Sequence, residues 1–213
     1  ASGVVKEHTT VRMSVGIFDV SHLGKALVSG PGAADYVNAT LSNDLGKIRH
    51  GKAQYTLCLD EATGGIVDDI IAYFHNDSHV LLVPNAANTA EVVRRLTEKA
   101  PEGVTVRNHH TQFAVLAVQG TKSDEVLERV GLPVGHEYMS FVEATFQDSG
   151  VVVCRTGYTG ERGYELIAKN EIAGALWDAL LEAGEEFGML ACGLGARDTL
   201  RTEMGYPLHG QDI

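Results

Sequence analysis

The sequence predicts an α+β fold made of two related units, each combining an antiparallel sheet with helices. Short apolar segments rich in β-branched residues follow one another with turn residues between them, which is typical of strands joined by hairpins. Segments with helical spacing of apolar residues separate the groups of strands. In addition, a strand, a glycine, small polar residues and a helix occur in this order twice, in the first half and again in the second.

The first half of the chain contains three helical patterns and five strand-like ones. The segment 33–41 places Ala34, Val37 and Leu41 at helical spacing. Glycine and proline at 30–32 separate this helix from the strand before it. By the same criteria we expect helices at 4–14, 33–41 and 89–100, and strands at 15–21, 25–29, 53–59, 66 onward and 80–83.

The second half repeats the opening pattern, because the apolar run 113–119 ends at Gly120 and leads into a helix, as 26–29 ends at Gly30. We expect the remaining elements to be a helix at 121–130, strands at 141–146, 151–155 and 164–168, a helix at 172–187 and a last helix after Gly193. The first lobe is therefore assigned to residues 1–103 and the second to residues 104–213, and interleaving of the two lobes is left open.

Composition excludes several classes of function. The chain has 213 residues, of which 44% are hydrophobic, so it can bury a substantial core. Its formal net charge of -11 argues against sequence-independent binding of nucleic acid, which needs a basic surface, and against a polybasic membrane surface. No apolar run is long enough to span a bilayer.

The cysteines and the chain ends add two expectations. Cys58, Cys154 and Cys192 are widely spaced and form no zinc or redox pair, which predicts a reducing compartment and no disulfide framework. No metal is implied by the sequence. The chain starts without an initiator Met, shows no targeting signal, and stops without closing an element. We therefore expect it to be a fragment of a longer protein.

The most informative stretch is the strand that begins at Ile66, after a Gly-Gly turn. Because side chains alternate between faces, Asp68 shares a face with Ile70 and Phe74, and Asp69 lies on the other face. Whichever face is the core, one carboxylate lies in an apolar row. Burial of an unpaired carboxylate is costly, so such a group is paired or functional. The alternative is a solvated turn with two structural aspartates.

Two further positions carry charge in unusual places. Glu165 follows a Gly-punctuated turn at 156–163 and lies on the strand face opposite Tyr164. Arg197 lies just inside the start of a helix, where the helix dipole disfavours a cation, which indicates a nearby anion. Asp198 is the simplest candidate for that anion. The phosphate-loop spacing at 46–52 is disfavoured because a strand, not a helix, follows it.

Four motifs together resemble one protein family. They are Phe18-Asp19-Val20-Ser21-His22, Gly64-Gly65-Ile66-Val67-Asp68-Asp69, the turn from Gly157 to Glu165, and Gly193-Leu194-Gly195-Ala196-Arg197-Asp198-Thr199-Leu200-Arg201. Their order is similar to that in the T-protein family of the glycine cleavage system, the tetrahydrofolate-dependent aminomethyltransferases. The resemblance covers essentially the whole chain.

The resemblance implies a fold of three lobes around a central folate site. The chain resembles the first two lobes, and the third, β-rich C-terminal lobe is absent from it. By resemblance Asp68 matches the catalytic aspartate, Glu165 the glutamate that binds the pterin ring, and Arg197 an arginine that contacts folate. The residues implied to line the same pocket are Tyr158, Val83, Asn85 and Asp69.

The resemblance also implies the reaction. The aminomethyl group on the lipoyl arm of a partner H-protein would pass to tetrahydrofolate, giving 5,10-methylenetetrahydrofolate and ammonia. The implied location is the bacterial cytoplasm, or the mitochondrial matrix for a processed eukaryotic protein. Three alternatives stay open: a folate-dependent demethylase, the folate domain of a sarcosine or dimethylglycine dehydrogenase, and a non-catalytic folate-binding fragment. The related iron–sulfur assembly factor is disfavoured, because its Cys-containing loop has no match here.

Overall fold

The computed structural model describes residues 2–213, which form two compact units. The five-stranded unit contains His22–Thr111 and His209–Ile213. The six-stranded unit contains the N-terminal segment up to Ser21 and Gln112–Leu208. Each unit has its own sheet and its own hydrophobic core. The two are therefore described separately.

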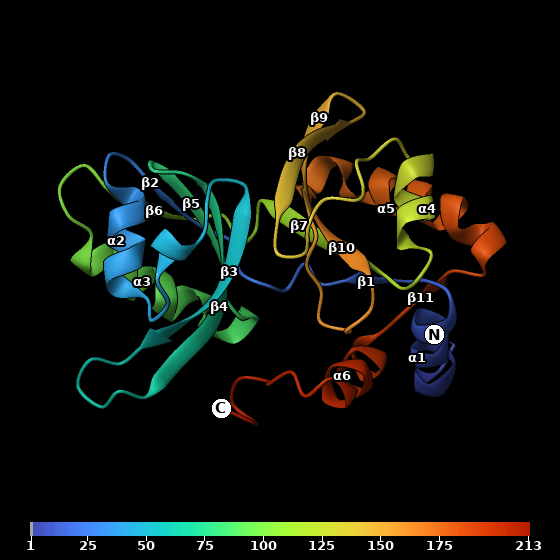
Figure 1. Cartoon of the computed structure of the whole chain (residues 1–213), viewed down its shortest axis with the longest axis horizontal. Helices are drawn as coiled ribbons and strands as arrows, with labels where there is room; N and C mark the ends of the chain where they lie inside the picture. Colours follow the sequence, from blue (N-terminus) through green and yellow to red (C-terminus); the bar gives the residue numbers. More distant parts are fainter. Residues whose placement is uncertain (1) are drawn as a thin grey trace. The chain divides into compact units, whose positions relative to one another are not determined.

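The five-stranded unit has an entirely antiparallel sheet with the strand order β3-β4-β5-β2-β6 (Figure 1). Long β3 and β4 form a hairpin, and β4 continues through a tight turn into β5. The elements are β2 (Ala26–Ser29), α2 (Ala33–Thr40), η1 (Leu45–Lys47), β3 (Lys52–Leu59), β4 (Ile66–Asn76), β5 (His79–Val83), η2 (Ala86–Asn88), α3 (Thr89–Lys99) and β6 (Thr105–Asn108).

Helices α2 and α3 cover one face of this sheet, and their apolar side chains share one core with it. On β4 that face carries Ile70, Ala72 and Phe74, all buried. The hydroxyl of Tyr36 on α2 donates a 2.6 Å hydrogen bond to the Leu96 carbonyl of α3, so the two helices are also joined directly. By strand alternation, Asp68 lies on this same helix-covered face.

The six-stranded unit has the strand order β11-β1-β7-β10-β9-β8. Strand β1 is parallel to β11, and the other pairings of this sheet are antiparallel. The elements are α1 (Val4–Met13), β1 (Gly16–Asp19), β7 (Phe113–Gln119), α4 (Ser123–Arg129), β8 (Phe141–Phe146), β9 (Ser149–Cys154), β10 (Gly163–Lys169), α5 (Asn170–Gly184), η3 (Glu185–Phe187), β11 (Leu190–Ala191) and α6 (Leu194–Glu203).

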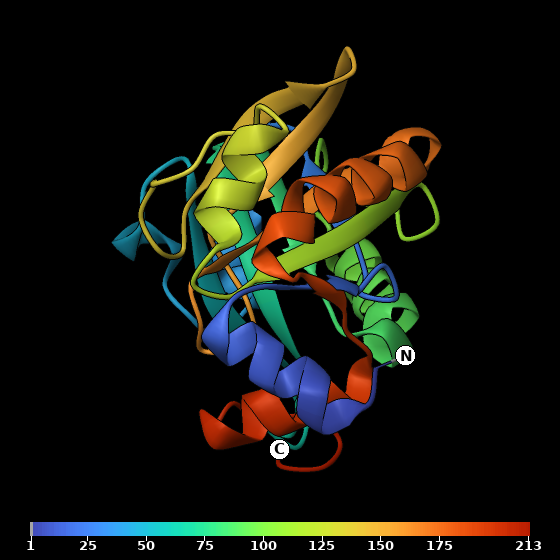
Figure 2. The same ribbon diagram turned by 90° about the vertical axis from the view of Figure 1, so that its right-hand side faces the viewer.

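Helices α4 and α5 pack on the sheet face that carries Tyr164, Leu166 and Ala168 of β10. Glu165 therefore lies on the opposite face. Helices α1 and α6 lie side by side, as both views show (Figures 1 and 2). The α1 carboxylate of Glu7 accepts a hydrogen bond from the backbone N–H of Gly193, which fixes the start of α6.

The predicted α+β class with antiparallel hairpins is confirmed, and the expected helices and longer strands agree with the structure to within a few residues. The sequence analysis missed the short strands β6 and β11. The compact units also group the chain differently from a division at residues 103 and 104. Strand β1 lies between β7 and β11, so the N-terminal segment belongs with the second half, an interleaving that the analysis had left open.

Candidate functional site

The carboxylate of Asp68 is the centre of a polar cluster in the five-stranded unit. The side chain is fully buried near the start of β4, in the same row as Ile70. It accepts three hydrogen bonds: from the Asn85 backbone N–H at 2.9 Å, from Asn85 Nδ2 at 2.9 Å and from Asn88 Nδ2 at 2.7 Å. A buried carboxylate with only N–H donors around it is held as a hydrogen-bond acceptor.

Burial and hydrogen bonding act on this carboxylate in opposite directions. Desolvation is the larger effect and raises the pKa of Asp68, and the neighbouring charge of Asp69 adds to the rise. The N–H groups of Asn85 and Asn88 favour the ionised form and lower the pKa in part. The result is a carboxylate that is more basic than a solvated aspartate and therefore a better proton or hydrogen-bond acceptor.

Local backbone structure explains why two asparagines meet Asp68. Strand β5 ends at Val83, since Pro84 has no N–H to continue the ladder. The following 3₁₀ turn η2 brings residues three apart onto one side, so Asn85 and Asn88 both face β4. The hydroxyl of Thr89 donates to the Asn85 carbonyl at 2.9 Å and secures the turn where α3 begins.

Asp69 lies on the other face of β4 but is tied to the same asparagine. Asn85 Nδ2 is 2.7 Å from Asp69 Oδ1, and the Tyr55 hydroxyl donates to Asp69 at 3.1 Å. The structure thus places the predicted residues Asp68, Asp69 and Asn85 in one cluster. Val83, also predicted, is half-buried at the end of β5 and pairs with Ile71. Asn88 was missed by the sequence analysis.

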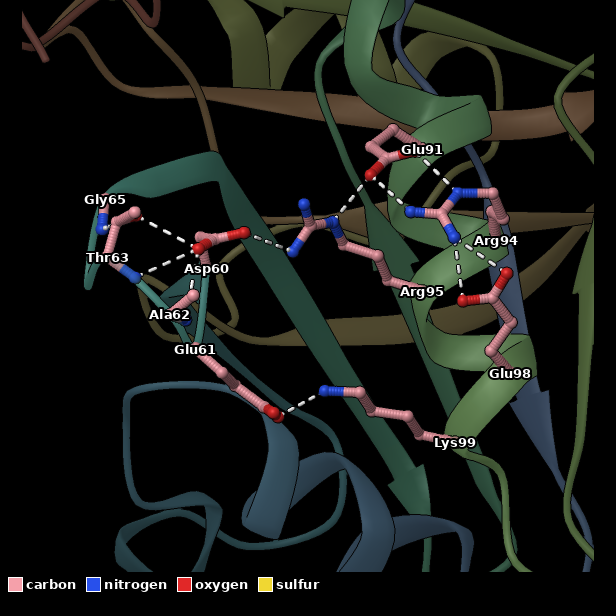
Figure 3. A network of polar contacts seen from close by, with 10 residues as sticks. All are labelled: Asp60, Glu61, Ala62, Thr63, Gly65, Glu91, Arg94, Arg95, Glu98 and Lys99. Atoms are coloured by element: carbon pink, nitrogen blue, oxygen red, sulfur yellow. Dashed lines mark hydrogen bonds and ion pairs between the residues drawn. The ribbon is translucent and has the colours of Figure 1, made fainter.

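A charged network holds the turn that precedes Asp68 against α3 (Figure 3). Asp60, at the start of the turn, accepts hydrogen bonds from Thr63 and lies 3.0 Å from Arg95 of α3. Arg95 also contacts Glu91 at 2.6 Å, and Lys99 pairs with Glu61. Because α3 begins directly after Asn88, the network joins both sides of the Asp68 cluster.

The second group of predicted residues lies in the six-stranded unit, around Glu165. This carboxylate is 9% exposed and accepts a hydrogen bond from the Thr156 hydroxyl. Below it, buried Gln119 donates to the Thr156 carbonyl at 3.2 Å and accepts from the Thr159 hydroxyl at 2.8 Å. A Cβ atom at Gly157 would lie 2.1 Å from Gln119 Oε1, so only glycine fits at that point of the turn.

Arg197 lies in the first turn of α6 with its guanidinium 4.6 Å from the centre of the Tyr158 ring. Burial lowers the pKa of Arg197, and the charge of Glu165 partly opposes this change. Asp198 is not its partner, because that carboxylate bonds Arg201 at 2.8 Å. The guanidinium of Arg197 therefore lies against the Tyr158 ring and within the field of the Glu165 charge.

Tyr158 is held from two sides. Its ring stacks on Tyr206 with centroids 5.9 Å apart, and its hydroxyl donates to the Pro207 carbonyl at 2.5 Å. Arg12 of α1 donates to the neighbouring Thr159 carbonyl, which ties the turn to α1. The predicted residues Glu165, Arg197 and Tyr158 therefore belong to one unit. Tyr206 and Gln119 were missed, since their contacts join segments far apart in sequence. Thr156 was missed although it is only 9 residues from Glu165, because a hydroxyl in a turn gives no signal of its own.

Within the described residues 2–213, no group of three or more His, Cys, Asp or Glu side chains is placed to hold a metal ion. No helix among the described residues is long and apolar enough to cross a membrane.

Comparison with known proteins places these residues in a family. The family model described as "GCVT N-terminal domain" matches residues 1–213. The chain belongs to this family. It is 62% identical over 211 residues to an aminomethyltransferase of Parafrankia sp. (strain EAN1pec), and 58% identical over 212 residues to the aminomethyltransferase of Mycobacterium tuberculosis (strain ATCC 25618 / H37Rv). These alignments cover 99% and 100% of this chain, but 58% of each relative. The chain thus spans little more than half the length of these relatives.

Solved structures agree with this assignment. The glycine cleavage system aminomethyltransferase T from Bartonella henselae superimposes with a TM-score of 0.91 and 35% identity, over 100% of this chain and 57% of that protein. The heterotetrameric sarcosine oxidase from Corynebacterium sp. U-96 superimposes with a TM-score of 0.64 at 12% identity, over 89% of this chain and 95% of that one, which shows a shared fold.

Proposed function

We propose that this chain carries the folate-binding and catalytic residues of a tetrahydrofolate-dependent aminomethyltransferase. The donor is the aminomethyl group on the lipoyl sulfur of an H-protein, and the products are 5,10-methylenetetrahydrofolate and ammonia. The observation that supports this most is the buried carboxylate of Asp68, which is surrounded by three N–H donors and is thereby kept as an acceptor. The chain's membership of the GCVT family supports the reaction class.

The chemistry explains why an acceptor is needed. Loss of the lipoyl thiolate leaves a methylene-iminium cation, and the lone pair of folate N5 attacks its carbon. Ammonia then leaves, and N10 attacks the same carbon to close the ring, with loss of the N10 proton. In this proposal the ionised Asp68 stabilises the developing positive charge and accepts the hydrogen bond of N10–H. No metal is required for any of these steps.

The proposed roles of the other residues follow from their donors and acceptors. Glu165 accepts two N–H bonds from the amino-pyrimidinone edge of the pterin, a geometry that carboxylates favour. The Thr156 hydroxyl occupies one side of this carboxylate and leaves its other lone pairs to the ligand. Arg197, whose guanidinium lies on the Tyr158 ring, meets a carboxylate or the pterin carbonyl of folate.

The first test is a calorimetric titration of the chain with tetrahydrofolate. We expect Glu165→Ala to abolish binding and Asp68→Asn to weaken it only slightly, because the proposed role of Asp68 lies in the reaction. Matched controls are Glu171→Ala and Asp35→Asn, exposed positions on α5 and α2 that should leave binding unchanged. Equal binding by the parent and Glu165→Ala would refute the pterin assignment.

The second test measures turnover with lipoylated H-protein. We expect Asp68→Asn to lower kcat by at least about 100-fold, the lower range for a lost acid–base or electrostatic group. Dependence on the lipoyl arm separates this function from a folate-dependent demethylase and from a folate-binding module. Full turnover by Asp68→Asn would refute the proposed electrostatic role of the Asp68 carboxylate. Folate binding without turnover by the parent chain would favour the alternative of a non-catalytic folate-binding module.

A further inference from the structure

A histidine contacts the Asp68 cluster, and the proposed reaction assigns it no role. Nδ1 of His209 is 3.0 Å from Nδ2 of Asn88, and the same Nδ2 is 2.7 Å from Oδ1 of Asp68. All three residues belong to the five-stranded unit, although His209 is 121 residues from Asn88 in sequence. The two contacts form a hydrogen-bonded series from the imidazole of His209 through the amide of Asn88 to the carboxylate of Asp68.

The hydrogens on the Asn88 amide and on the His209 ring can be assigned by elimination. An ionised carboxylate only accepts, so the Asn88 atom that faces Asp68 must be the amide nitrogen rather than the amide oxygen. That nitrogen carries two hydrogens: one points to Asp68 and the other is available to the histidine. His209 Nδ1 must then be the acceptor, and its ring proton must be on Nε2.

We propose that His209 is a positioning residue for Asp68: its neutral Nε2–H tautomer fixes the amide of Asn88 so that an N–H faces the carboxylate. Without a second contact, the amide of Asn88 could rotate and present its oxygen to Asp68. Asp68 would then lose one of its three N–H donors and face a second acceptor. The orientation itself stands on geometry alone, and only its consequence for catalysis rests on the proposed function.

The hydrogen bond from Asn88 to His209 depends on the protonation state of the imidazole. An imidazolium ring has two donors and no acceptor, so protonated His209 cannot accept from Asn88. The charged groups next to these hydrogen bonds are Asp68 and Asp69, both on β4. Asp68 takes part in them itself, and Asp69 is linked to Asp68 through the side chain of Asn85. Asp212 is the titratable neighbour in the segment of His209 itself. The residues of η2 next to these hydrogen bonds carry no charge.

The test is nitrogen NMR of the histidine rings and of the Asn88 side-chain amide in the whole chain. We expect the neutral His209 ring to be the Nε2–H tautomer and the two Asn88 amide protons to have separate, slowly exchanging signals. Once His209 is protonated in acid, the two Asn88 amide protons should exchange faster and lose their separate signals. Asp68→Asn should shift His209 toward a mixture of tautomers, because the amide of Asn88 is then free to present its oxygen.

Two substitutions of His209 provide matched variants. His209→Asn puts an oxygen near the place of Nδ1, so it should keep the Asn88 pattern at every pH. His209→Leu removes the acceptor and should give the Asn88 pattern of the acidified parent at neutral pH. An Nδ1–H tautomer in the parent, or an Asn88 pattern that is unchanged in His209→Leu, would overturn the proposal. A His209→Leu chain that does not fold leaves the parent tautomer as the deciding result.

These spectra are recorded without folate or H-protein, so they are independent of the proposed function. Where turnover is measurable, we expect His209→Leu to lower kcat about tenfold with little change in KM. His209→Asn should keep kcat, because its side-chain oxygen can accept from the Asn88 amide in place of Nδ1. The expected tautomer with an inactive parent would support the positioning role and count against the proposed reaction. An Nδ1–H tautomer in an active parent would overturn the positioning role and support the proposed reaction.

Discussion

Removing the carboxylate of Glu7 should loosen both the start of α1 and the start of α6. Glu7 is 3% exposed, and its two oxygens accept three backbone hydrogen bonds, from Ser2 at 2.9 Å, Gly3 at 3.1 Å and Gly193 at 2.9 Å. The first two N–H groups precede α1, and the third belongs to the residue before α6. One side chain therefore caps two helices.

The expected loss can be estimated from these bonds. A hydrogen bond to a charged group contributes about 1.5–3 kcal/mol, but contributions at one carboxylate are not additive, and Ser2 and Gly3 are exposed to water. We therefore expect Glu7→Ala to lower the free energy of unfolding by about 3 kcal/mol. For a chain of this size that is a decrease in Tm of roughly 6–12 °C.

The pH dependence gives a second, independent check. The hydrogen bond from Gly193 is the largest cause that lowers the pKa of Glu7 in the folded state. A lowered folded-state pKa means that the stabilisation is present above the unfolded pKa and is lost as the pH falls through the folded pKa. The difference between the parent and Glu7→Ala should thus be full at pH 7 and shrink in acid.

The assay is thermal and urea unfolding at neutral and acidic pH. Glu171→Ala is the matched control, because Glu171 is an exposed glutamate in the first turn of α5 and makes no comparable cap. The control should change stability by less than about 0.5 kcal/mol. If Glu7→Ala matches the control at pH 7, or if its deficit grows in acid, the capping argument is wrong.

Four further outcomes can be measured with the same methods or by titration. Thr156→Val removes the hydroxyl that donates to the proposed pterin carboxylate and should weaken folate binding about tenfold by calorimetry. Gly120→Ala puts a Cβ 2.2 Å from the Ser14 carbonyl at φ +134° and should cost at least about 2 kcal/mol in urea unfolding, whereas Gly174→Ala, in open space within α5, should stabilise by about 0.5–1 kcal/mol. Arg95→Met breaks the partly exposed ion pair to the β3–β4 turn and should lower Tm only slightly, by a difference that fades at high salt.

Local patterns predicted the parts of the structure that depend on local physics. The alternation along β4 predicted that one carboxylate would join the apolar row, and Asp68 is that residue. The glycine spacing predicted a turn before Glu165, and the structure has one. Helix and strand limits differed by a few residues, because ends depend on caps and neighbours.

Contacts between distant segments could not be read from the sequence. The four residues of β6 form a strand because β2 lies beside them, and β11 has only two residues. Asn88 and His209 are ordinary polar residues until the fold brings them to Asp68. A single signal existed for Asn88: two asparagines three residues apart at a helix start, directly after a strand.

The interleaved chain path sets an order of assembly. The five-stranded unit is almost continuous in sequence and can form its sheet once β6 has been made. Strand β1, by contrast, must wait for β7 and then for β11, close to the end of the chain. Among the strands of this unit, β1 comes first in the sequence and is therefore among the last to be fully paired.

The same order applies to the surroundings of Asp68. Asn85 and Asn88 can enclose Asp68 as soon as α3 begins, but His209 arrives only after the entire six-stranded unit has been synthesised. In the proposed arrangement, the contacts of Asp68 with Asn85 and Asn88 can form before His209 reaches Asn88. The position of residue 209 in the sequence, rather than formation of the sheet, then decides when the Asn88 amide is fixed.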